Sequence, residues 1–420
     1  MDELTYPSGI LAGTSSRREI QCDKSGGLNR YRRTWAGSDN AAFSAHAIIV
    51  KSGRADINGL RPDQFPFTMA QNFLAGTKQK VHTGRRKIAA VTLRCGAAYM
   101  TRTLLIDTDT ASDDAVALIM ALRSSEVRVA AITVVAGNVP LSQAVSNALF
   151  TAELCGSHVP VYSGAEGPVL RKLATADWFH GTDGLGDHGY KPAKRRAERG
   201  HAVDALIQTV RENPGIEIVA LGPLTNLAMA LLREPKLAAS VKRCVVMGGA
   251  PCCEGNVTPA AEFNIWVDPE AARIVFRSGL RFEMVSWQLC RGDAVLNPHE
   301  MERVLALKNP IAEFAIRCNS TAVEAFFKQT GQRGMSLPDP VAMGIALNPA
   351  LCTSSSEHYV EIEVCSELTR GMTVVDRLDV ATDSRNKDVW ANTIENERKV
   401  HVCWSLDIPK WKNLLFSALA

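Results

Sequence analysis

Short apolar runs alternate with segments of helical hydrophobic period along most of the chain after residue 102. The apolar runs cover residues 103–107, 129–137, 216–222, 242–249 and 281–287. The helical periods lie near residues 113–124, 141–155, 201–212, 224–233 and 268–278. Near-continuous apolar strands that alternate with helices are typical of a parallel sheet covered on both sides. The pattern therefore predicts an α/β fold, a mostly parallel twisted sheet with helices on both faces and an open, Rossmann-like topology.

The first 99 residues lack this alternation. Only residues 45–50 and 87–93 have the character of short strands, and no helical period is sustained. This segment carries 15 Lys and Arg against 7 Asp and Glu, a net charge of +8, whereas the rest of the chain carries −5. We expect residues 1–99 to be a poorly ordered, dispensable basic extension of a domain formed by residues 100–420. Because the basic residues are dispersed and no recognised motif accompanies them, we expect no nucleic-acid partner.

The cysteines and the longest apolar runs indicate a compartment. The eleven cysteines are scattered, odd in number and without a C-x-x-C pair, which favours reduced thiols over a disulfide framework or a zinc site. No apolar run approaches the roughly 20 residues of a membrane span, and residues 1–20 lack the apolar core of a signal peptide. We therefore expect a cytoplasmic protein that does not enter membranes.

Four aspartates lie within eight positions where the first apolar run meets the first helix: Asp107, Asp109, Asp113 and Asp114. Ser112 is a suitable N-cap, so we expect the helix to begin at Asp113. Aspartates are favoured in a first helical turn by the helix dipole, but this explains at most the last two. Carboxylates gathered at a strand-to-helix turn suit a hard cation such as Ca²⁺ or Mg²⁺. The cluster thus predicts a metal site at the carboxyl end of a strand, where open α/β sheets bind ligands.

Two enzyme families begin with an apolar strand followed by D-x-D. In haloacid-dehalogenase-type phosphatases the motif D-x-D-x-T would correspond to Asp107, Asp109 and Thr110, with Asp107 as nucleophile and Mg²⁺ as cofactor. The inosine–uridine nucleoside hydrolases open with a motif close to D-x-D-x-x-x-D-D-x-x-A-L. The sequence DTDTASDDAVAL at 107–118 resembles this second motif along its whole length, and the phosphatase pattern does not explain the Asp113–Asp114 pair.

Further segments resemble the nucleoside hydrolases in family order. They are TVVAGNV (133–139), HGTDGLGD (180–187), ALGPLTNLAMAL (220–231), VVMGGAPCCEGNVTPAAEFNIWVDPEAARIVF (245–276), LPDPVAMGIAL (337–347) and GMTVVD (371–376), the last resembling the C-terminal strand. The resemblance begins at Thr103 and covers the chain except for the extension. It implies the nucleoside hydrolase fold and hydrolysis of the N-glycosidic bond of ribonucleosides to ribose and free base.

The resemblance assigns roles to the acidic residues. It implies a Ca²⁺ ion bound by Asp109, Asp114, Asp339 and the backbone carbonyl of Leu221. Asp109 would also be the general base that activates water, because it should contact both metal and water. Asp113 would accept a hydrogen bond from a ribose hydroxyl, and Asp107 would support the cluster from behind or be a simple strand-end aspartate.

The remaining assigned residues would bind the substrate: Asn138, Met247, Asn256, Glu262 and Asn264. Glu262 and Asn264 are two positions apart, so in an extended segment both side chains would face the ribose. The glycines after Met247 would let the backbone approach the ligand.

Departure of the base is less well defined. Many family members have a histidine directly before the last aspartate, where this chain has Pro338. His180 would then protonate the base, or an aromatic stack would make the base a better leaving group, or His180 only caps the glycine-rich loop. We expect Trp178 and Trp266 to be packing residues. The other alternative function is a Ca²⁺-dependent nucleoside- or ribose-binding protein without catalytic activity. The family resemblance also implies that the protein forms a homodimer or homotetramer.

Overall fold

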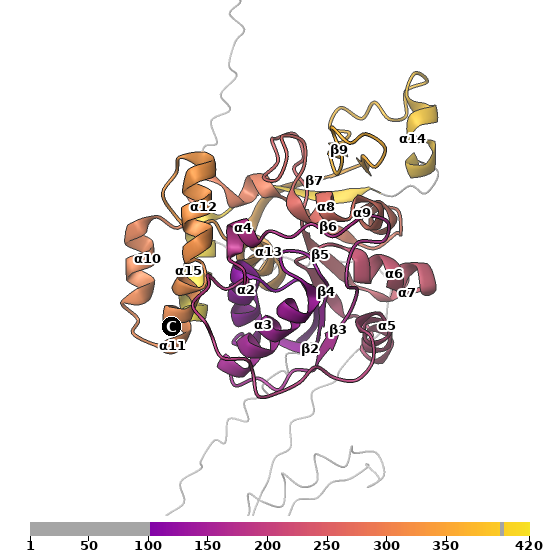
Figure 1. Ribbon diagram of the computed structural model, residues 1–420. Coiled ribbons are helices and arrows are strands. Elements are labelled where there is room, and N and C mark those ends of the chain that lie inside the picture. The colour runs from indigo at the N-terminus through magenta and orange to yellow at the C-terminus, as the bar shows by residue number, and fades with distance from the viewer. Residues whose placement is uncertain (1–100, 395–398) are drawn as a thin grey trace, which may run out of the picture. The chain divides into compact units, whose positions relative to one another are not determined.

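An eight-stranded sheet forms the centre of the computed structural model, which describes residues 101–394 and 399–420 (Figure 1). The strand order is β3-β2-β1-β4-β5-β6-β10-β7. Neighbouring strands are parallel except for β10 and β7, so β7 is an antiparallel edge. The strands are β1 Arg102–Thr108, β2 Val127–Val134, β3 Val161–Ser163, β4 Glu217–Ala220, β5 Arg243–Met247, β6 Phe282–Val285, β7 Cys352–His358 and β10 Val400–Leu406.

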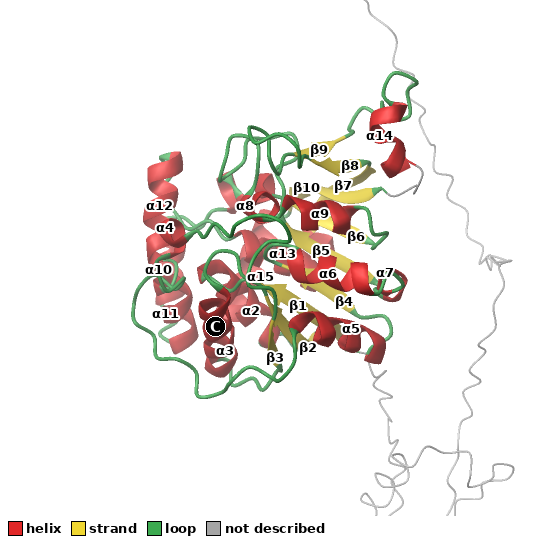
Figure 2. Cartoon of the chain, turned by 45° about the vertical axis from the view of Figure 1, so that its right-hand side comes forward, coloured by secondary structure: helices red, strands yellow, loops and turns green. Residues whose placement is uncertain are grey.

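Helices cover both faces of this sheet, as the hydrophobic pattern predicts (Figures 1 and 2). Alternate residues of β1 enter opposite cores: Leu104 and Ile106 belong to one, and Leu105 to the other. The first core is closed by α2 Ser112–Leu122, α3 Leu141–Leu154, α13 Pro338–Leu347 and α15 Ile408–Leu419. The second is closed by α5 Ala202–Glu212, α6 Thr225–Arg233, α7 Leu237–Ser240 and α9 Pro269–Phe276. The predicted α/β fold is confirmed.

The other elements lie at the ends and sides of the sheet. The helices are α4 Asp177–His180, α8 Phe263–Val267, α10 Pro298–Leu305, α11 Pro310–Arg317, α12 Ser320–Thr330 and α14 Lys387–Ile394, and the 3₁₀ turns are Trp287–Cys290, Gly292–Ala294 and Pro349–Leu351. β8 Val360–Ile362 and β9 Thr373–Val375 form a separate antiparallel pair, visible beside α14 in Figure 2. The expectation that 371–376 supplies the C-terminal strand is wrong, because β10 follows it and joins the main sheet.

The strand order reverses at β1. The chain runs from β1 outward to β2 and β3, and then returns to place β4 on the other side of β1. Connections that leave two neighbouring strands in opposite directions open a crevice at their carboxyl ends, which is where open α/β sheets bind ligands. The aspartates lie at the end of β1, in the turn after it and in the first turn of α2, and Leu221 directly follows β4. The topology therefore places two of the predicted metal-binding segments beside the same crevice.

The predicted strands and helices of the alternating pattern agree with the structure to within a few residues, but the start of the first helix is capped differently. Helix α2 begins at Ser112, and its N-cap is Ala111, so the prediction of Ser112 as N-cap is wrong. The Asp114 carboxylate performs the capping instead, because its Oδ2 accepts a hydrogen bond from Ala111 N at 2.9 Å. The Ser112 hydroxyl is thereby free to make another contact.

Two further expectations concern the described residues only. All nine cysteines there are free, as predicted from their scatter. In the same part of the chain no helix combines the length and apolar character needed to cross a membrane. The predicted extension, with its short strands at 45–50 and 87–93, lies outside the described residues.

Candidate active site

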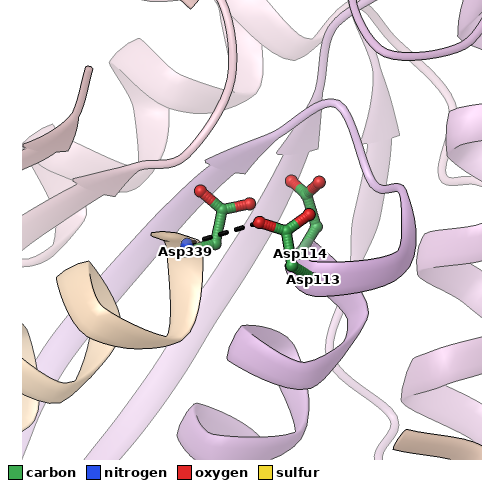
Figure 3. A group of neighbouring side chains, drawn as sticks. All are labelled: Asp113, Asp114 and Asp339. Carbon is green, nitrogen blue, oxygen red and sulfur yellow. Dashed lines mark hydrogen bonds between the residues drawn. The ribbon is translucent and has the colours of Figure 1, made fainter. Parts of the chain in front are cut away.

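Three carboxylates meet where α2 and α13 begin. One oxygen from each of Asp113, Asp114 and Asp339 lies within 4.8 Å of the others, and all three residues are buried (Figure 3). Asp113 and Asp114 occupy the first turn of α2, and Asp339 occupies the first turn of α13. The Asp339 backbone N–H donates to Asp113 Oδ2 at 3.5 Å. Two segments more than 200 residues apart in sequence thus form one acidic cluster.

Asp109 lies beside this cluster and is tightly enclosed. Its Oδ2 accepts a hydrogen bond from Asn138 N at 2.6 Å, while its Oδ1 is buried with no hydrogen-bond partner. A Cβ added at Gly137 would lie 2.1 Å from Oδ2, and one at Gly222 would lie 2.6 Å from Oδ1. Only glycine permits so close an approach of backbone to the carboxylate. Asp109 therefore has one oxygen held by the fold and one without a protein partner.

Asp107 is enclosed between β2 and the start of α6. Its Oδ1 accepts hydrogen bonds from Thr133 Oγ1 at 2.5 Å and Asn226 Nδ2 at 2.9 Å, and the side chain is fully buried. Burial raises the pKa of Asp107 to about 7, although both hydrogen bonds act in the opposite direction. The phosphatase pattern does not explain the Asp113–Asp114 pair, and this pair forms part of the acidic cluster. The phosphatase alternative is not favoured.

The electrostatics of the cluster suit a cation. Burial, followed by the charges of Asp114, Asp113 and Asp109, raises the pKa of Asp339 well above its usual range. Burial and the charge of Asp114 likewise raise the pKa of Asp109. Buried carboxylates that repel one another are stabilised by a positive charge between them. An all-oxygen donor set with an unpartnered buried oxygen fits a hard divalent ion such as Ca²⁺ or Mg²⁺.

A pocket opens beside the acidic cluster, and Asp113 and Asp339 line it. Most sequence-predicted substrate and metal residues line it: Asp113, Asn138, His180, Leu221, Met247, Asn256, Glu262, Asn264 and Asp339. Its other lining residues were not predicted and include Phe179, Phe263, Trp287, Asn319, Gln329 and Ser336. Trp287, Asn319 and Gln329 have no local sequence signal, because the turn after β6 and helix α12 reach the pocket only through the tertiary fold.

Glu262 and Asn264 are arranged differently from the prediction. They do not lie in an extended segment: Glu262 is the N-cap of α8, and its carboxylate accepts hydrogen bonds from Asn264 N and Ile265 N. The Asn264 amide turns toward the sheet and donates to Leu221 O at 2.6 Å and to Met247 O at 3.3 Å. A carbonyl oxygen has two lone pairs, so Leu221 O keeps one for a further partner. A capped helix start, and not a strand, brings both side chains to the pocket.

His180 ends α4 and is buried at the pocket wall. Its Nδ1 lies 2.8 Å from Ser112 Oγ and 3.9 Å from Asp113 Oδ1. Burial lowers the pKa of His180 to about 4, against a smaller opposite effect of the Asp114 charge. The imidazole is therefore neutral near pH 7. It can donate a hydrogen bond from one ring nitrogen, but it is not an imidazolium with protons on both nitrogens.

The two tryptophans near the site differ. Trp178 is 55% exposed and lines the pocket, so its prediction as a packing residue is wrong. Its helix, α4, has only four residues, of which His180 is the buried one. Trp266 packs as predicted, with the Arg370 guanidinium 4.0 Å above its ring. Trp178 and Phe179 therefore offer aromatic surface to a bound base, together with Phe263 and Trp287 of the same pocket lining.

Comparison with known proteins identifies the family. Residues 104–413 match the inosine-uridine preferring nucleoside hydrolase family. Pyrimidine-specific ribonucleoside hydrolase RihB of Escherichia coli is 36% identical over 69% of this chain and 91% of its own length, and an uncharacterised protein of Schizosaccharomyces pombe is 40% identical over 65% and 88%. A solved plant nucleoside hydrolase superimposes with a TM-score of 0.71 at 32% identity, over 76% of this chain and 99% of its own. The chain belongs to the inosine–uridine preferring nucleoside hydrolase family, whose enzymes hydrolyse the N-glycosidic bond of ribonucleosides.

Proposed function

We propose that this chain hydrolyses ribonucleosides with the help of a Ca²⁺ ion held by Asp109, Asp114, Asp339 and the carbonyl of Leu221. The observation that carries the proposal is the group of buried carboxylates at the crevice beside β1. The unpartnered Asp109 Oδ1 and the spare lone pair of Leu221 O supply further oxygens. Several carboxylates together with a backbone carbonyl suit Ca²⁺, which takes six to eight oxygen ligands. When bound, the ion would grip ribose hydroxyls and make a water molecule more acidic.

The protein groups each have a part in the reaction. The bond between C1′ and the base nitrogen breaks with its electron pair leaving on the base, through an oxocarbenium-like transition state. A water oxygen forms the new bond to C1′, and Asp109 accepts the water proton. Asp113, Asn138, Asn256, Glu262 and Asn264 hold the ribose, with Met247 beneath it. Asp107 keeps the β1 turn in place through Thr133 and Asn226.

His180 is the group that we assign to the leaving base. Among the described lining residues the other titratable side chains are acids on the floor of the pocket: Asp113, Glu262 and Asp339. The low pKa of His180 favours a neutral imidazole that donates a hydrogen bond to the departing base, in place of an imidazolium that gives up a proton. The base then takes its final proton from solvent. Pro338 has no side-chain donor and only bounds the pocket.

A nucleoside panel tests this function. The full chain should release ribose from at least one purine or pyrimidine ribonucleoside, measured as reducing sugar. Activity should disappear on chelation, return with added Ca²⁺ more fully than with Mg²⁺, and be absent in Asp109→Ala. Tight, Ca²⁺-dependent ribose binding without turnover would show a silent binding protein instead. Turnover of phosphate esters alone would contradict the proposal outright.

We further propose that the enzyme works in the cytoplasm as a homodimer or homotetramer. The free state of all nine described cysteines supports a reducing compartment. Light scattering after size-exclusion chromatography of the full chain measures the mass directly. A monomer at micromolar concentration with full activity would refute the assembly without affecting the assignment of the pocket.

A further inference from the structure

The hydroxyl of Ser112 contacts the imidazole of His180, which lines the pocket. Ser112 Oγ lies 2.8 Å from His180 Nδ1, and neither residue exposes more than a small part of its surface. Ser112 was expected only to cap a helix, but Ala111 takes that position. The hydroxyl of the first residue of α2 therefore has no capping function. Its position in the first turn of α2 also places it directly before Asp113 and Asp114.

The surroundings of the two groups decide which of them donates this hydrogen bond. Either Ser112 O–H donates to Nδ1, or Nδ1–H donates to Ser112 Oγ. In the second case the buried serine proton needs an acceptor, and among the described residues the Ser112 hydroxyl contacts no group other than His180 within hydrogen-bonding distance. Asp113 Oδ1, at 3.9 Å from Nδ1, is too far to accept from the ring. Because a buried unpaired donor costs about 1–3 kcal/mol, the serine donates and Nδ1 accepts.

The other ring nitrogen then carries the proton. Nε2 makes no hydrogen bond to a described residue, and it is not completely buried. The Nε2 edge of the ring is therefore reached from the pocket that His180 lines. A neutral imidazole with Nδ1 accepting presents Nε2–H to the ligand.

The backbone of Ser112 is held as firmly as its side chain. Its carbonyl accepts a hydrogen bond from Asn319 Nδ2 at 3.3 Å and a weaker one from Cys318 Sγ at 3.6 Å. Asn319 is fully buried and also donates to Ala315 O at 2.9 Å. The junction between α11 and α12 therefore fixes the first turn of α2, and with it the direction of the hydroxyl. Ser112 is placed by contacts that do not involve the acidic cluster.

We propose that Ser112 is a positioning residue that holds His180 as the Nε2–H tautomer, so that the ring donates a hydrogen bond to the leaving base. This inference rests on the proposed function of the same pocket. As the bond from C1′ to the base breaks, the electron pair moves to the base, and Nε2–H stabilises that charge without transferring its proton. Without the serine hydroxyl the ring exchanges between tautomers, and the one with Nδ1–H offers the base no donor.

Two substrates separate this role from a structural one. A nucleoside needs help for its base to leave, whereas a p-nitrophenyl riboside has a leaving group that is stable as an anion. Ser112→Ala should lower kcat for the nucleoside about ten-fold, the worth of one hydrogen bond, with KM nearly unchanged. The same variant should keep the wild-type rate on the nitrophenyl riboside. Ser286→Ala is a matched control, because Ser286 is fully buried with an unpartnered hydroxyl and lies outside the pocket lining.

Nitrogen NMR tests the tautomer without any reaction. In ¹⁵N-histidine-labelled full chain, the signals absent from His180→Gln belong to His180. Wild type and Ser286→Ala should show the proton on Nε2, and Ser112→Ala should show a mixture of both tautomers. A proton on Nδ1 in the wild type overturns the proposal, as does an equal loss of rate on both substrates in Ser112→Ala. If the wild type cleaves neither substrate, the proposed function fails, and the NMR result still decides the tautomer.

Discussion

The floor and the rim of the pocket are built in different ways. The floor is the group of Asp113 and Asp339, which line the pocket, with Asp109 and Asp114 beside them; all four are buried in a turn or a first helical turn. The rim is formed by α4 and α12, where Trp178 is half-exposed and Gln329 reaches across to the carbonyl of Asn256 at 2.5 Å. A rigid floor suits the bond that all ribonucleosides share, and a looser rim suits the bases by which they differ.

The largest loss of activity is expected from Asp339→Asn, a substitution on the floor. This change removes a carboxylate of the cluster, and kcat/KM for the best nucleoside should fall by about 10³-fold. Because it also removes a buried charge that repels its neighbours, the melting temperature of the metal-free variant should rise above that of the wild type. Activity assays and thermal melts in chelator measure both effects. Asp293→Asn, an exposed carboxylate away from the pocket, should change neither. Wild-type activity in Asp339→Asn would contradict the role of this residue in the acidic cluster.

A smaller loss of activity is expected from Gly222→Ala, which distorts the floor but leaves its charge unchanged. The methyl group of Gly222→Ala would lie 2.6 Å from Asp109 Oδ1 and 2.9 Å from Asp109 N, so the carboxylate must move. We expect kcat to fall by about 10²-fold, because displacements of about 1 Å have effects of this size in active sites. The matched control is Gly167→Ala, whose new methyl group meets only Leu173 Cβ at 3.7 Å. Equal activity of the two variants would show that the enclosure of Asp109 is unimportant.

At the rim, Trp178→Ala should change binding more than chemistry. The ring lines the mouth of the pocket and offers a surface on which a base can stack. Stacking of a base on an aromatic side chain is worth about 1–3 kcal/mol, so KM should rise roughly ten-fold while kcat changes little. Leu170→Ala, an exposed apolar side chain outside the pocket lining, should leave KM unaltered. A fall in kcat as large as that of the floor variants would erase the distinction between floor and rim.

The difference between floor and rim also separates what the sequence predicts from what it does not. The floor carries short motifs, after β1 and at the start of α13, that resemble those of the family, so the resemblance assigned Asp109, Asp114 and Asp339 together. The rim depends on how α4 and α12 pack, and neither the exposure of Trp178 nor the approach of Gln329 has a local signal. Glu262 and Asn264 were found, but their backbone was wrongly predicted as extended, because a helix of five residues is too short for its period to show.

The same logic explains the error at Ser112. A serine before two aspartates is a standard N-cap pattern, and the alternative cap by Asp114 uses the backbone of Ala111, which has no side-chain signature. The partner of the freed hydroxyl, His180, lies 68 residues away. Local rules describe the first turn of a helix, but only the fold decides which polar side chain enters the pocket.

The sign of the pH dependence of stability should report on the buried carboxylates of the pocket. Burial raises the pKa of Glu262 to about 7 and that of Asp113 to about 6, so the folded state binds protons that the unfolded state has released. Stability of the metal-free protein should therefore rise as pH falls from 8 to 6.5, with melting temperature increasing by about 2–6 °C. Below about 6.5 the buried neutral His180 begins to oppose this trend. Saturating Ca²⁺ should flatten the curve, and a metal-free curve that falls toward pH 6.5 would contradict the assignment.

The smallest effect is expected from a region that contributes to neither floor nor rim. All residues that we assign to the pocket lie between Asp107 and Asp339, so a chain that begins at Met100 should keep the kcat and KM of the full chain. Its Ca²⁺ requirement and its response to Trp178→Ala should also be the same, since both regions remain intact. Parallel assays of the two forms, each checked for folding by thermal melting, make the comparison. A folded truncated chain with greatly reduced kcat would mean that residues 1–99 take part in the floor, whereas a raised KM alone would place them at the rim.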